Sequence, residues 1–384
     1  MKDIIKKTGQ HKCFGIASRL AFTIMILGLF LFSGIAAAAT PPLLPFNSTG
    51  DLFVMDNGGY NILRITSAGN VFIEVSEAQI TAATGSVDVS LSNRGLAFDA
   101  NNAMYFTDGE SDTILKKIPG GPLTVLTTQA AVLAATGDTE ASLRGIAFGS
   151  DSFLYVIETE TDTVLRVDPN TGAVTVYVPN SAFLTASGET NIDLQCGIVG
   201  AEGGIIYVAS DDDIDAIFRI ALGSPPVVSV LVSGTPFNDL DVYMTRAPNG
   251  DLIIADNSGA DTIYRVTPAG VVSVFLSKAQ LDAVTGEDVD LEGGIAFDSV
   301  GNFYVAEAET DSILRFNPAL NGVVWISAAA MEAVAGEDVD LGGAIAFNQG
   351  RDVAVPTMTE WGILIFILFA GLGSVAYLRK ARMA

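Results

Sequence analysis

The sequence predicts an all-β protein, a six-bladed β-propeller. Three observations predict it. A unit of four short strands, rich in β-branched residues and separated by Gly, Asn and Asp, recurs about every 50 residues. The unit occurs six times. The first copy starts at its second strand, and a lone first strand follows the sixth copy.

The four strands of a unit are clearest in the last complete copy. Its first strand is the Gly-Ile-Ala-Phe motif at 294–297, and its second strand lies at 303–306. The third strand, at 313–315, contains one basic residue. The fourth strands are rich in Val and Leu, as at 271–276. Four such strands form one blade of a propeller.

A short helix is expected after the fourth strand in five of the six units. Each helix would begin at a Ser, Thr or Asn cap and end at a Gly, which suits the left-handed position after a helix. The pairs are Ser76 and Gly85, Thr128 and Gly137, Asn180 and Gly188, Ser277 and Gly286, and Ser327 and Gly336. The fourth unit breaks the pattern, because it contains Pro225-Pro226 and no such helix.

The two ends of the array are expected to close the ring. The lone first strand at 344–347 would pair with the second strand at 52–55 in one shared blade. This pairing removes two open strand edges, which otherwise invite pairing with other chains. The sequence therefore predicts one propeller over residues 50–350.

Each unit but the fourth has an acid at the end of its second strand and a base in its third. We expect structural ion pairs across these hairpins rather than repeated active sites. The pairs are Asp56 with Arg64, Asp108 with Lys116, Glu158 with Arg166, Asp256 with Arg265, and Glu307 with Arg315.

Residues 1–39 are typical of a secretory signal peptide. A basic start is followed by an apolar run at 20–35 and the small residues Ala37-Ala38-Ala39, the pattern of a cleavage site. An uncleaved anchor helix is the alternative. Residues 40–49 would be a linker. Cleavage would remove His11, the only histidine, and would leave Cys196 as the only cysteine.

Residues 351–384 contain a short motif, an uncharged apolar stretch at 363–378 that predicts a transmembrane helix, and a basic end. The segment resembles the IPTL-CTERM sorting signal, which is related to the PEP-CTERM class. The matching residues are Pro356, Thr357, Glu360, Trp361 and Gly362. Val355 and Met358 depart from that motif's Ile and Leu.

This resemblance implies an exosortase-type sorting enzyme as a partner. It also implies anchorage in the membrane of a Gram-negative bacterium, followed by sorting to the cell surface or the extracellular matrix. An ordinary tail anchor is the alternative.

The charge of the chain excludes one class of function. The net charge is −24, and residues 40–354 contain 42 Asp and Glu against 12 Lys and Arg. A nucleic-acid binder needs a basic face to neutralise phosphates, so we expect no nucleic-acid partner. A mature chain without histidine also excludes catalysis by a Ser-His-Asp or Cys-His arrangement.

The blade sequence, as at 294–307, resembles NHL-repeat and gluconolactonase-like six-bladed propellers. Such relatives hold a divalent cation at the channel mouth with Glu, Asn and Asp. The resemblance implies Asn93, Asp241 and Glu292 as the matching ligands, although Arg94 and Arg144 would repel a metal there.

The mouth of the central channel is also the expected place for a polar ligand such as a charged sugar. Most of the candidate binding residues lie just before the first strand of a unit. Arg246 lies within the first strand of the fifth unit. They are Asn93, Arg94, Arg144, Gln195, Asp241, Arg246 and Glu292. Solvation of a wet pore is the alternative.

Calcium is the candidate cofactor. Asp211, Asp213 and Asp215 offer clustered oxygen ligands of the kind that hard cations bind, although they match no EF-hand loop. A merely solvated acidic surface is the alternative.

Taken together, these features indicate a non-enzymatic binding or matrix module of the cell envelope, with an envelope or extracellular polysaccharide as a candidate ligand. The alternative function is a metal-dependent hydrolase or lactonase of the gluconolactonase-like type.

Overall fold

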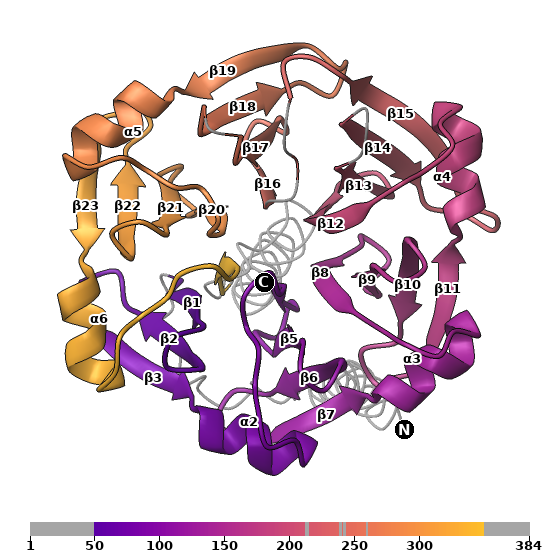
Figure 1. The fold of residues 1–384 in the computed structure, drawn as a ribbon, viewed down its shortest axis with the longest axis horizontal. Helices are drawn as coiled ribbons and strands as arrows, with labels where there is room; N and C mark the ends of the chain where they lie inside the picture. The colour runs from indigo at the N-terminus through magenta and orange to yellow at the C-terminus, as the bar shows by residue number, and fades with distance from the viewer. Residues whose placement is uncertain (1–49, 212–214, 238–239, 241–242, 259, 349–384) are drawn as a thin grey trace, which may run out of the picture. The chain divides into compact units, whose positions relative to one another are not determined.

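A computed structural model describes residues 50–211, 215–237, 240, 243–258 and 260–348. They form six four-stranded antiparallel sheets arranged as blades around a central axis (Figure 1), which confirms the predicted six-bladed propeller.

The strands of each blade follow one another from the axis outwards. Blade 1 is β24 (Ile345–Phe347), β1 (Leu52–Asp56), β2 (Asn61–Ile65) and β3 (Val71–Val75). Blade 2 is β4 (Leu96–Phe98), β5 (Met104–Asp108), β6 (Thr113–Lys117) and β7 (Leu123–Thr127). Blade 3 is β8 (Leu143–Phe148), β9 (Leu154–Glu158), β10 (Thr163–Val167) and β11 (Val174–Val178).

The second half of the ring repeats this order. Blade 4 is β12 (Leu194–Ala201), β13 (Ile205–Ser210), β14 (Ala216–Ala221) and β15 (Val227–Ser233). Blade 5 is β16 (Met244–Arg246), β17 (Leu252–Asp256), β18 (Thr262–Val266) and β19 (Val272–Leu276). Blade 6 is β20 (Ile295–Phe297), β21 (Phe303–Glu307), β22 (Ser312–Phe316) and β23 (Gly322–Ile326).

The ring closes as predicted, in blade 1. The last described strand, β24, pairs antiparallel with the first, β1, so that Leu52 faces Phe347 and Val54 faces Ile345. Beyond this pair, the Asn348 side chain accepts a hydrogen bond from the Asp51 N–H at 2.6 Å. Two segments almost 300 residues apart therefore complete one sheet, and neither leaves an open edge.

The hydrophobic core lies between the blades. The second strands are buried over nearly their whole length, because both of their faces pack against neighbouring blades. One cluster joins Tyr105 of blade 2 to Val156 and Leu165 of blade 3. Two-sided burial explains why these strands read as near-continuous apolar runs.

Five helices decorate the outside of the ring (Figure 1). They are α2 (Glu77–Thr84), α3 (Gln129–Thr136), α4 (Asn180–Ser187), α5 (Lys278–Thr285) and α6 (Ala328–Ala335). Ser76 and Ser277 form capping boxes. The five helices each end at the predicted glycine, which has a positive φ of 77–82°. Each helix packs on the outer strand of the next blade.

One predicted helix start is wrong by a residue. Pro179, not Asn180, caps α4, and Asn180 is its first residue. The spacing from the cap to the terminal glycine is therefore the same in all five helices. As predicted, the described residues of blade 4 add no helix after β15.

The predicted ion pairs across the hairpins are wrong in their acidic partners, because the arginines pair with other carboxylates. Asp56 faces Asn61, whereas Arg64 faces Phe53, so the acid and the base stand at opposite ends of the hairpin. Arg64 instead pairs with Asp51 at 3.0 Å. The same arrangement gives Arg166 with Asp151 and Arg265 with Asp251.

The acids at the ends of the second strands have a different role. Asp56 accepts hydrogen bonds from the backbone N–H groups of Gly58 and Gly59 in its own turn, and from Asp340 in the connection between blades. Glu158 binds Thr161 and Ser142 in the same way. Each of these buried carboxylates therefore fastens its hairpin turn to the connection that leads into the first strand of the same blade.

Those turns and connections share one side of the ring. The Asn57 N–H donates to Asp340 O and the Ala308 N–H to Asp290 O, which brings the turns between second and third strands against the connections. We call this side the upper face. The opposite side, with the turns between first and second strands, is the lower face.

Several predicted segments lie outside the described residues: the signal peptide at 1–39, the linker at 40–49, and the sorting signal at 351–384 with its transmembrane helix at 363–378. Within the described part of the chain, no helix is long and apolar enough to cross a membrane.

Candidate functional site

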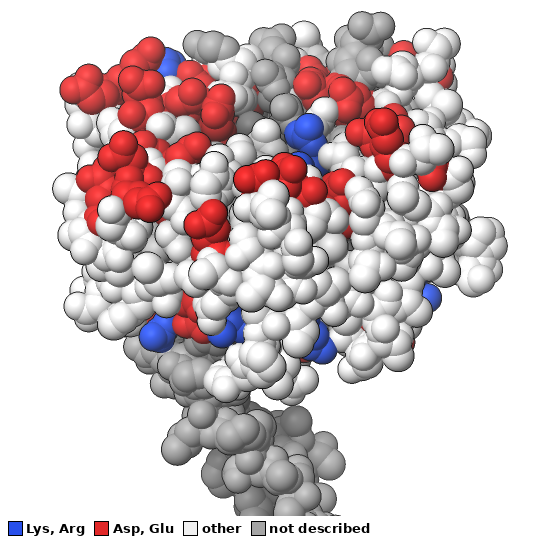
Figure 2. Space-filling view, turned by 60° about the horizontal axis from the view of Figure 1, so that its bottom comes forward, with Lys and Arg blue, Asp and Glu red and all other residues white. Residues whose placement is uncertain are grey.

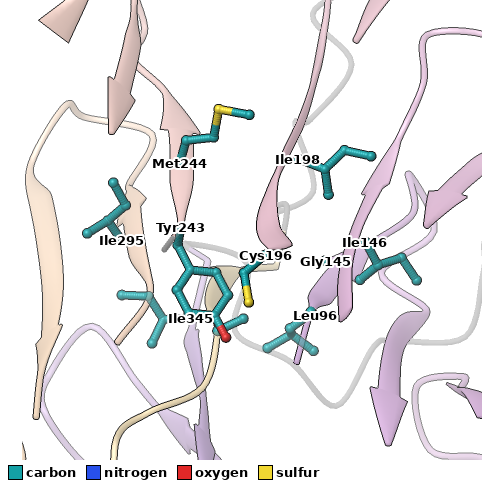
Figure 3. A pocket seen from close by; sticks show the side chains of 11 residues that line it. Leu96, Gly145, Ile146, Cys196, Ile198, Tyr243, Met244, Ile295 and Ile345 are labelled. Carbon is teal, nitrogen blue, oxygen red and sulfur yellow. The ribbon is translucent and has the colours of Figure 1, made fainter. Parts of the chain in front are cut away.

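The first strands of the six blades surround a narrow apolar cavity on the axis. Its volume is about 60 Å³, room for only a few water molecules. The lining side chains come from every blade (Figure 3): Leu96, Ile146, Ile198, Met244, Ile295 and Ile345. The axis is therefore narrow at this level, with space for water rather than for a sugar-sized ligand.

At the upper end of the axis, backbone hydrogen bonds join neighbouring blades. The Ala344 N–H donates to Arg94 O at 3.2 Å, the Gly95 N–H to Arg144 O at 3.2 Å, and the Gly294 N–H to Gly343 O at 3.0 Å. Neighbouring blades thus bond to one another directly here. A Cβ at Gly95 would overlap Ile146, and one at Gly294 would overlap Ile345. Close approach of the blades explains the recurrent glycine before the first strand.

Tyr243 occupies that position in blade 5. Its side chain crosses the top of the cavity, and its hydroxyl donates to the main-chain carbonyl of Arg94 in blade 2 at 3.0 Å. Figure 3 shows the ring beside Cys196, a buried thiol that forms no disulfide and donates to the Asn93 carbonyl at 3.4 Å. Burial, together with the neighbouring Cys196, raises the pKa of Tyr243 well above its usual value. Tyr243 is therefore a neutral plug.

Two of the predicted residues, Arg94 and Arg144, come together above this plug. The Arg94 guanidinium lies over Gly109, where a Cβ would overlap it. Burial, and then the positive charge of Arg144, lower the pKa of Arg94. Among the described residues, Arg94 has no carboxylate within 4.0 Å, and its buried Nε has no hydrogen-bond partner.

Backbone bonds fix the position of both arginines. The Arg144 carbonyl accepts from the Thr107 hydroxyl at 2.8 Å. Asn93, with a positive φ of 53°, donates its N–H to Gly342 O at 2.9 Å. The Arg94 Nη1 also donates to the Asn93 carbonyl at 3.4 Å, which favours the position of the guanidinium over Gly109.

Other predicted site residues lie around or away from this pair. The Gln195 amide donates to Asp193 at 2.7 Å, and Glu292 is exposed. Arg246 is not at the mouth. It ends β16 on the lower face and pairs with Glu202 at 3.1 Å, because its position corresponds to the last residue of the other first strands. Asp241 lies outside the described residues.

Of the predicted calcium ligands, Asp211 and Asp215 are described and Asp213 is not. The Asp211 N–H donates to Asp193 O, and the Asp215 carbonyl accepts from Gly234. Within the described ranges, no group of three or more His, Cys, Asp or Glu is arranged to hold a metal ion. Calcium binding at 211–215 stays a prediction.

The two arginines stand in acidic surroundings. Figure 2 shows acidic side chains gathered towards one side of the ring and most basic ones at the opposite rim. The exposed acids of the turns and connections are Asp88, Glu110, Asp138, Glu140, Glu160, Glu287, Asp288, Glu292, Glu309, Glu337, Asp338 and Asp340.

Three less exposed carboxyls on this face have raised pKa values. Burial raises the pKa of Asp112 to about 6. Burial and then Glu292 raise that of Asp290 to about 6, and burial followed by Asp340 has the same effect on Asp311. The upper face is therefore strongly negative at neutral pH except at the mouth.

Tyr243 and Gly109 were missed by sequence reasoning. A signal for Tyr243 was present, since Gly or Ala fills its position in the other five blades. No local pattern identifies Gly109, because its importance comes from an arginine of the same blade folded back over it.

The comparisons with known proteins concern the fold. No protein-family model and no curated protein matches the sequence. A solved protein of unknown function from Bacteroides caccae is 12% identical, covering 78% of this chain and 99% of that one, with a TM-score of 0.53.

Two further solved structures have lower TM-scores. The calcium-binding protein regucalcin from Agrobacterium tumefaciens is 16% identical over 62% of this chain and 74% of its own, with a TM-score of 0.45. A gluconolactonase from Xanthomonas campestris is 14% identical over 66% and 83%, with a TM-score of 0.44. At such identities a likeness concerns architecture alone. The chain is a six-bladed β-propeller.

Proposed function

We propose that this protein is a non-catalytic binding module that takes one anionic group of an otherwise uncharged ligand at the mouth above Tyr243. One observation carries the proposal. The half-buried guanidinium of Arg94 is held beside Arg144 with no carboxylate within 4.0 Å among the described residues.

Two like charges this close, partly out of water, repel each other. An anion between them would offset that repulsion and would supply an acceptor for the Arg94 Nε, which has no hydrogen-bond partner, whereas Nη1 donates to the Asn93 carbonyl at 3.4 Å. The planar guanidinium suits a carboxylate or a phosphate. An anion at this position would therefore add to the attraction that Asp112 already exerts on Arg94.

The surroundings of the pair restrict the ligand. Exposed acids ring the mouth, so an extended polyanion would be repelled along its length. A single charged sugar, or a neutral glycan bearing one acidic group, meets only the arginines. The small volume of the axial cavity supports binding at the mouth rather than deep within the ring.

The alternative, a metal-dependent hydrolase or lactonase, would need a cation held by Asn93, Asp241 and Glu292. Glu292 points towards solvent as an exposed side chain. A rise in melting temperature with added calcium, lost on mutation of Glu292, would favour this alternative over the binding module.

The location is proposed from the two chain ends. The protein is exported through residues 1–39, anchored by residues 363–378 and sorted by an exosortase-type enzyme to the cell surface or matrix, where an envelope or extracellular polysaccharide is its ligand. Cell fractionation should find the wild-type chain at the surface and an E360A/W361A variant retained in the membrane. Equal distribution of the two would contradict the sorting proposal.

The binding proposal is tested by calorimetric titration of the full chain in detergent with D-glucuronate, glucose 6-phosphate and glucose. We expect both anions to bind and glucose to bind at least 10-fold more weakly. Arg94→Gln should weaken anion binding at least 10-fold.

Arg246→Gln is the matched control, because Arg246 lies on the lower face and pairs with an exposed Glu202. It should bind like wild type. Equal binding by R94Q, or no binding of either anion, would overturn the assignment.

A further inference from the structure

A second pocket lies on the lower face, between blades 6 and 1. Its volume is about 340 Å³, at the lower end of the range for small-ligand sites. Its polar and aromatic lining includes Ser67, Asp298, Asn302, Tyr304, Arg315 and Trp325. The site is distinct from the mouth above Tyr243, since none of these residues belongs to the upper face.

In blades 1, 3 and 5 the basic residue of the third strand pairs with a carboxylate of its own blade. Arg64 pairs with Asp51 in blade 1 at 3.0 Å, and Arg265 pairs with Asp251 in blade 5. In both blades the acid immediately precedes the second strand. The cation on the lower face is thereby neutralised within its own blade.

Blade 6 lacks that acid. Asn302 stands directly before β21, in the position of Asp51 and Asp251. Among the described residues, Arg315 consequently has no carboxylate within 4.0 Å. One amide in place of a carboxylate leaves the guanidinium available to a ligand in the pocket.

The pocket is held in shape by its own hydrogen bonds. The Asp298 carboxylate accepts from the Asn302 amide at 2.7 Å and from the Tyr304 hydroxyl at 3.1 Å. The Tyr304 and Trp325 rings meet edge to face, with centroids 5.1 Å apart. Arg315 lies 5.7 Å from the centroid of the Trp325 ring. These groups are therefore in place before any ligand arrives.

The corresponding groove between blades 2 and 3 offers an internal comparison. It is similar in size, about 400 Å³, and has the same tyrosine–aspartate bond between Tyr105 and Asp99. However, its cation is engaged, because Lys116 donates to Pro169 O at 2.7 Å, and no tryptophan lines it. Of these two pockets, only the one at blade 6 combines a tryptophan with a guanidinium that has no carboxylate within 4.0 Å among the described residues; the side-chain neighbour of Arg315 there is the Tyr304 hydroxyl.

We infer that the pocket between blades 6 and 1 is a binding site for one sugar residue that carries a carboxylate, a uronic acid unit. The Arg315 guanidinium would bind the carboxylate with paired hydrogen bonds. The aromatic surface of Trp325 would pack against the apolar face of the pyranose ring, and Asn302 and Ser67 would bind its hydroxyls. The inference does not depend on the function proposed for the upper face.

The test uses the full chain in detergent with the R94Q substitution, so that binding at the upper mouth is weakened at least 10-fold. Methyl β-D-glucuronide and methyl β-D-glucoside are titrated by calorimetry and by tryptophan fluorescence. We expect saturable binding of the glucuronide with a change in Trp325 fluorescence, and at least 10-fold weaker binding of the neutral glucoside.

Asn302→Asp is the decisive variant. It installs the residue that blades 1 and 5 already have, so the fold should tolerate it, and its carboxylate should pair with Arg315. Glucuronide binding should then fall at least 10-fold, as it should in R315Q. Asp251→Asn in blade 5 is the matched control and should bind normally. Unchanged binding in N302D or R315Q, equal binding of the glucoside, or no saturable binding would each overturn the inference.

Discussion

The hydroxyl of Tyr243 donates a hydrogen bond to the main-chain carbonyl of Arg94 at 3.0 Å, across the axis of the propeller and 149 residues away in sequence. This contact links blade 5 to blade 2 and closes the cavity beneath the two arginines. The plug and the proposed ligand seat therefore share one residue, Arg94, through its main chain and its side chain respectively.

Two substitutions of Tyr243 should lower the unfolding free energy of the ring by different amounts. Tyr243→Phe removes one neutral hydrogen bond and should cost about 1 kcal/mol of unfolding free energy. Tyr243→Ala also removes a buried ring and should cost about 3–5 kcal/mol. Urea unfolding measures both. Tyr264→Phe is the control, because that hydroxyl reaches Pro236 O only at 3.5 Å, and it should change little. A Y243A protein as stable as wild type would show that the axis is not held by this residue.

Removing the charge of Arg94 should not weaken the fold. Arg94→Met relieves repulsion with Arg144, so the melting temperature should stay level or rise while anion binding is lost. Arg64→Met is the contrasting control, since it removes the guanidinium that pairs with the fully buried Asp51 carboxylate and should cost about 3 kcal/mol. If R94M lost as much stability as R64M, Arg94 would be a structural residue rather than a ligand-binding one.

A double-mutant cycle distinguishes the observed ion pair from the one expected across the hairpin. Asp51 and Arg64 are in contact at 3.0 Å and partly or fully buried, so D51N and R64M should couple by about 1–3 kcal/mol. Asp56 binds backbone N–H groups at the far end of the hairpin, so D56N and R64M should add within about 0.5 kcal/mol. Strong coupling of the second pair would contradict the register described.

Stability should increase as the pH falls from 7 towards 5. The pKa values of Asp112, Asp290 and Asp311 are raised to about 6 in the folded protein from an ordinary value of 3.8. A raised carboxyl pKa means that the folded state binds more protons than the unfolded state between about pH 4 and 6. Stability from these groups is therefore full below pH 4 and lost as the pH rises through 6.

Thermal unfolding across this range measures the effect. Asp311→Asn keeps an acceptor for the Leu341 N–H and should flatten the pH dependence. Glu309→Gln, at an exposed neighbour, should leave it unchanged. A melting temperature that falls steadily from pH 7 to pH 5 would contradict the raised pKa values.

The local features of the fold could be predicted from the sequence, because each depends on residues close together in the chain. Strand positions follow from short β-branched runs, and helix ends follow from Ser or Thr caps and from glycines such as Gly286, whose conformation is set within one turn. Ring closure also followed, since the six-fold repeat leaves the strand at 344–347 with one possible partner, β1.

The tertiary structure alone decided which side chains meet. The sequence placed Arg64 opposite Asp56, but the hairpin register makes Asp51 its partner. It grouped Arg246 with the channel mouth, but strand length sends that residue to the lower face. The sequence placed Arg94 and Arg144 at the mouth, where the two charges interact, but it gave no role to Tyr243, which hydrogen-bonds across the axis. The Tyr243–Arg94 contact joins residues of different blades 149 positions apart, and no periodicity within one blade encodes it.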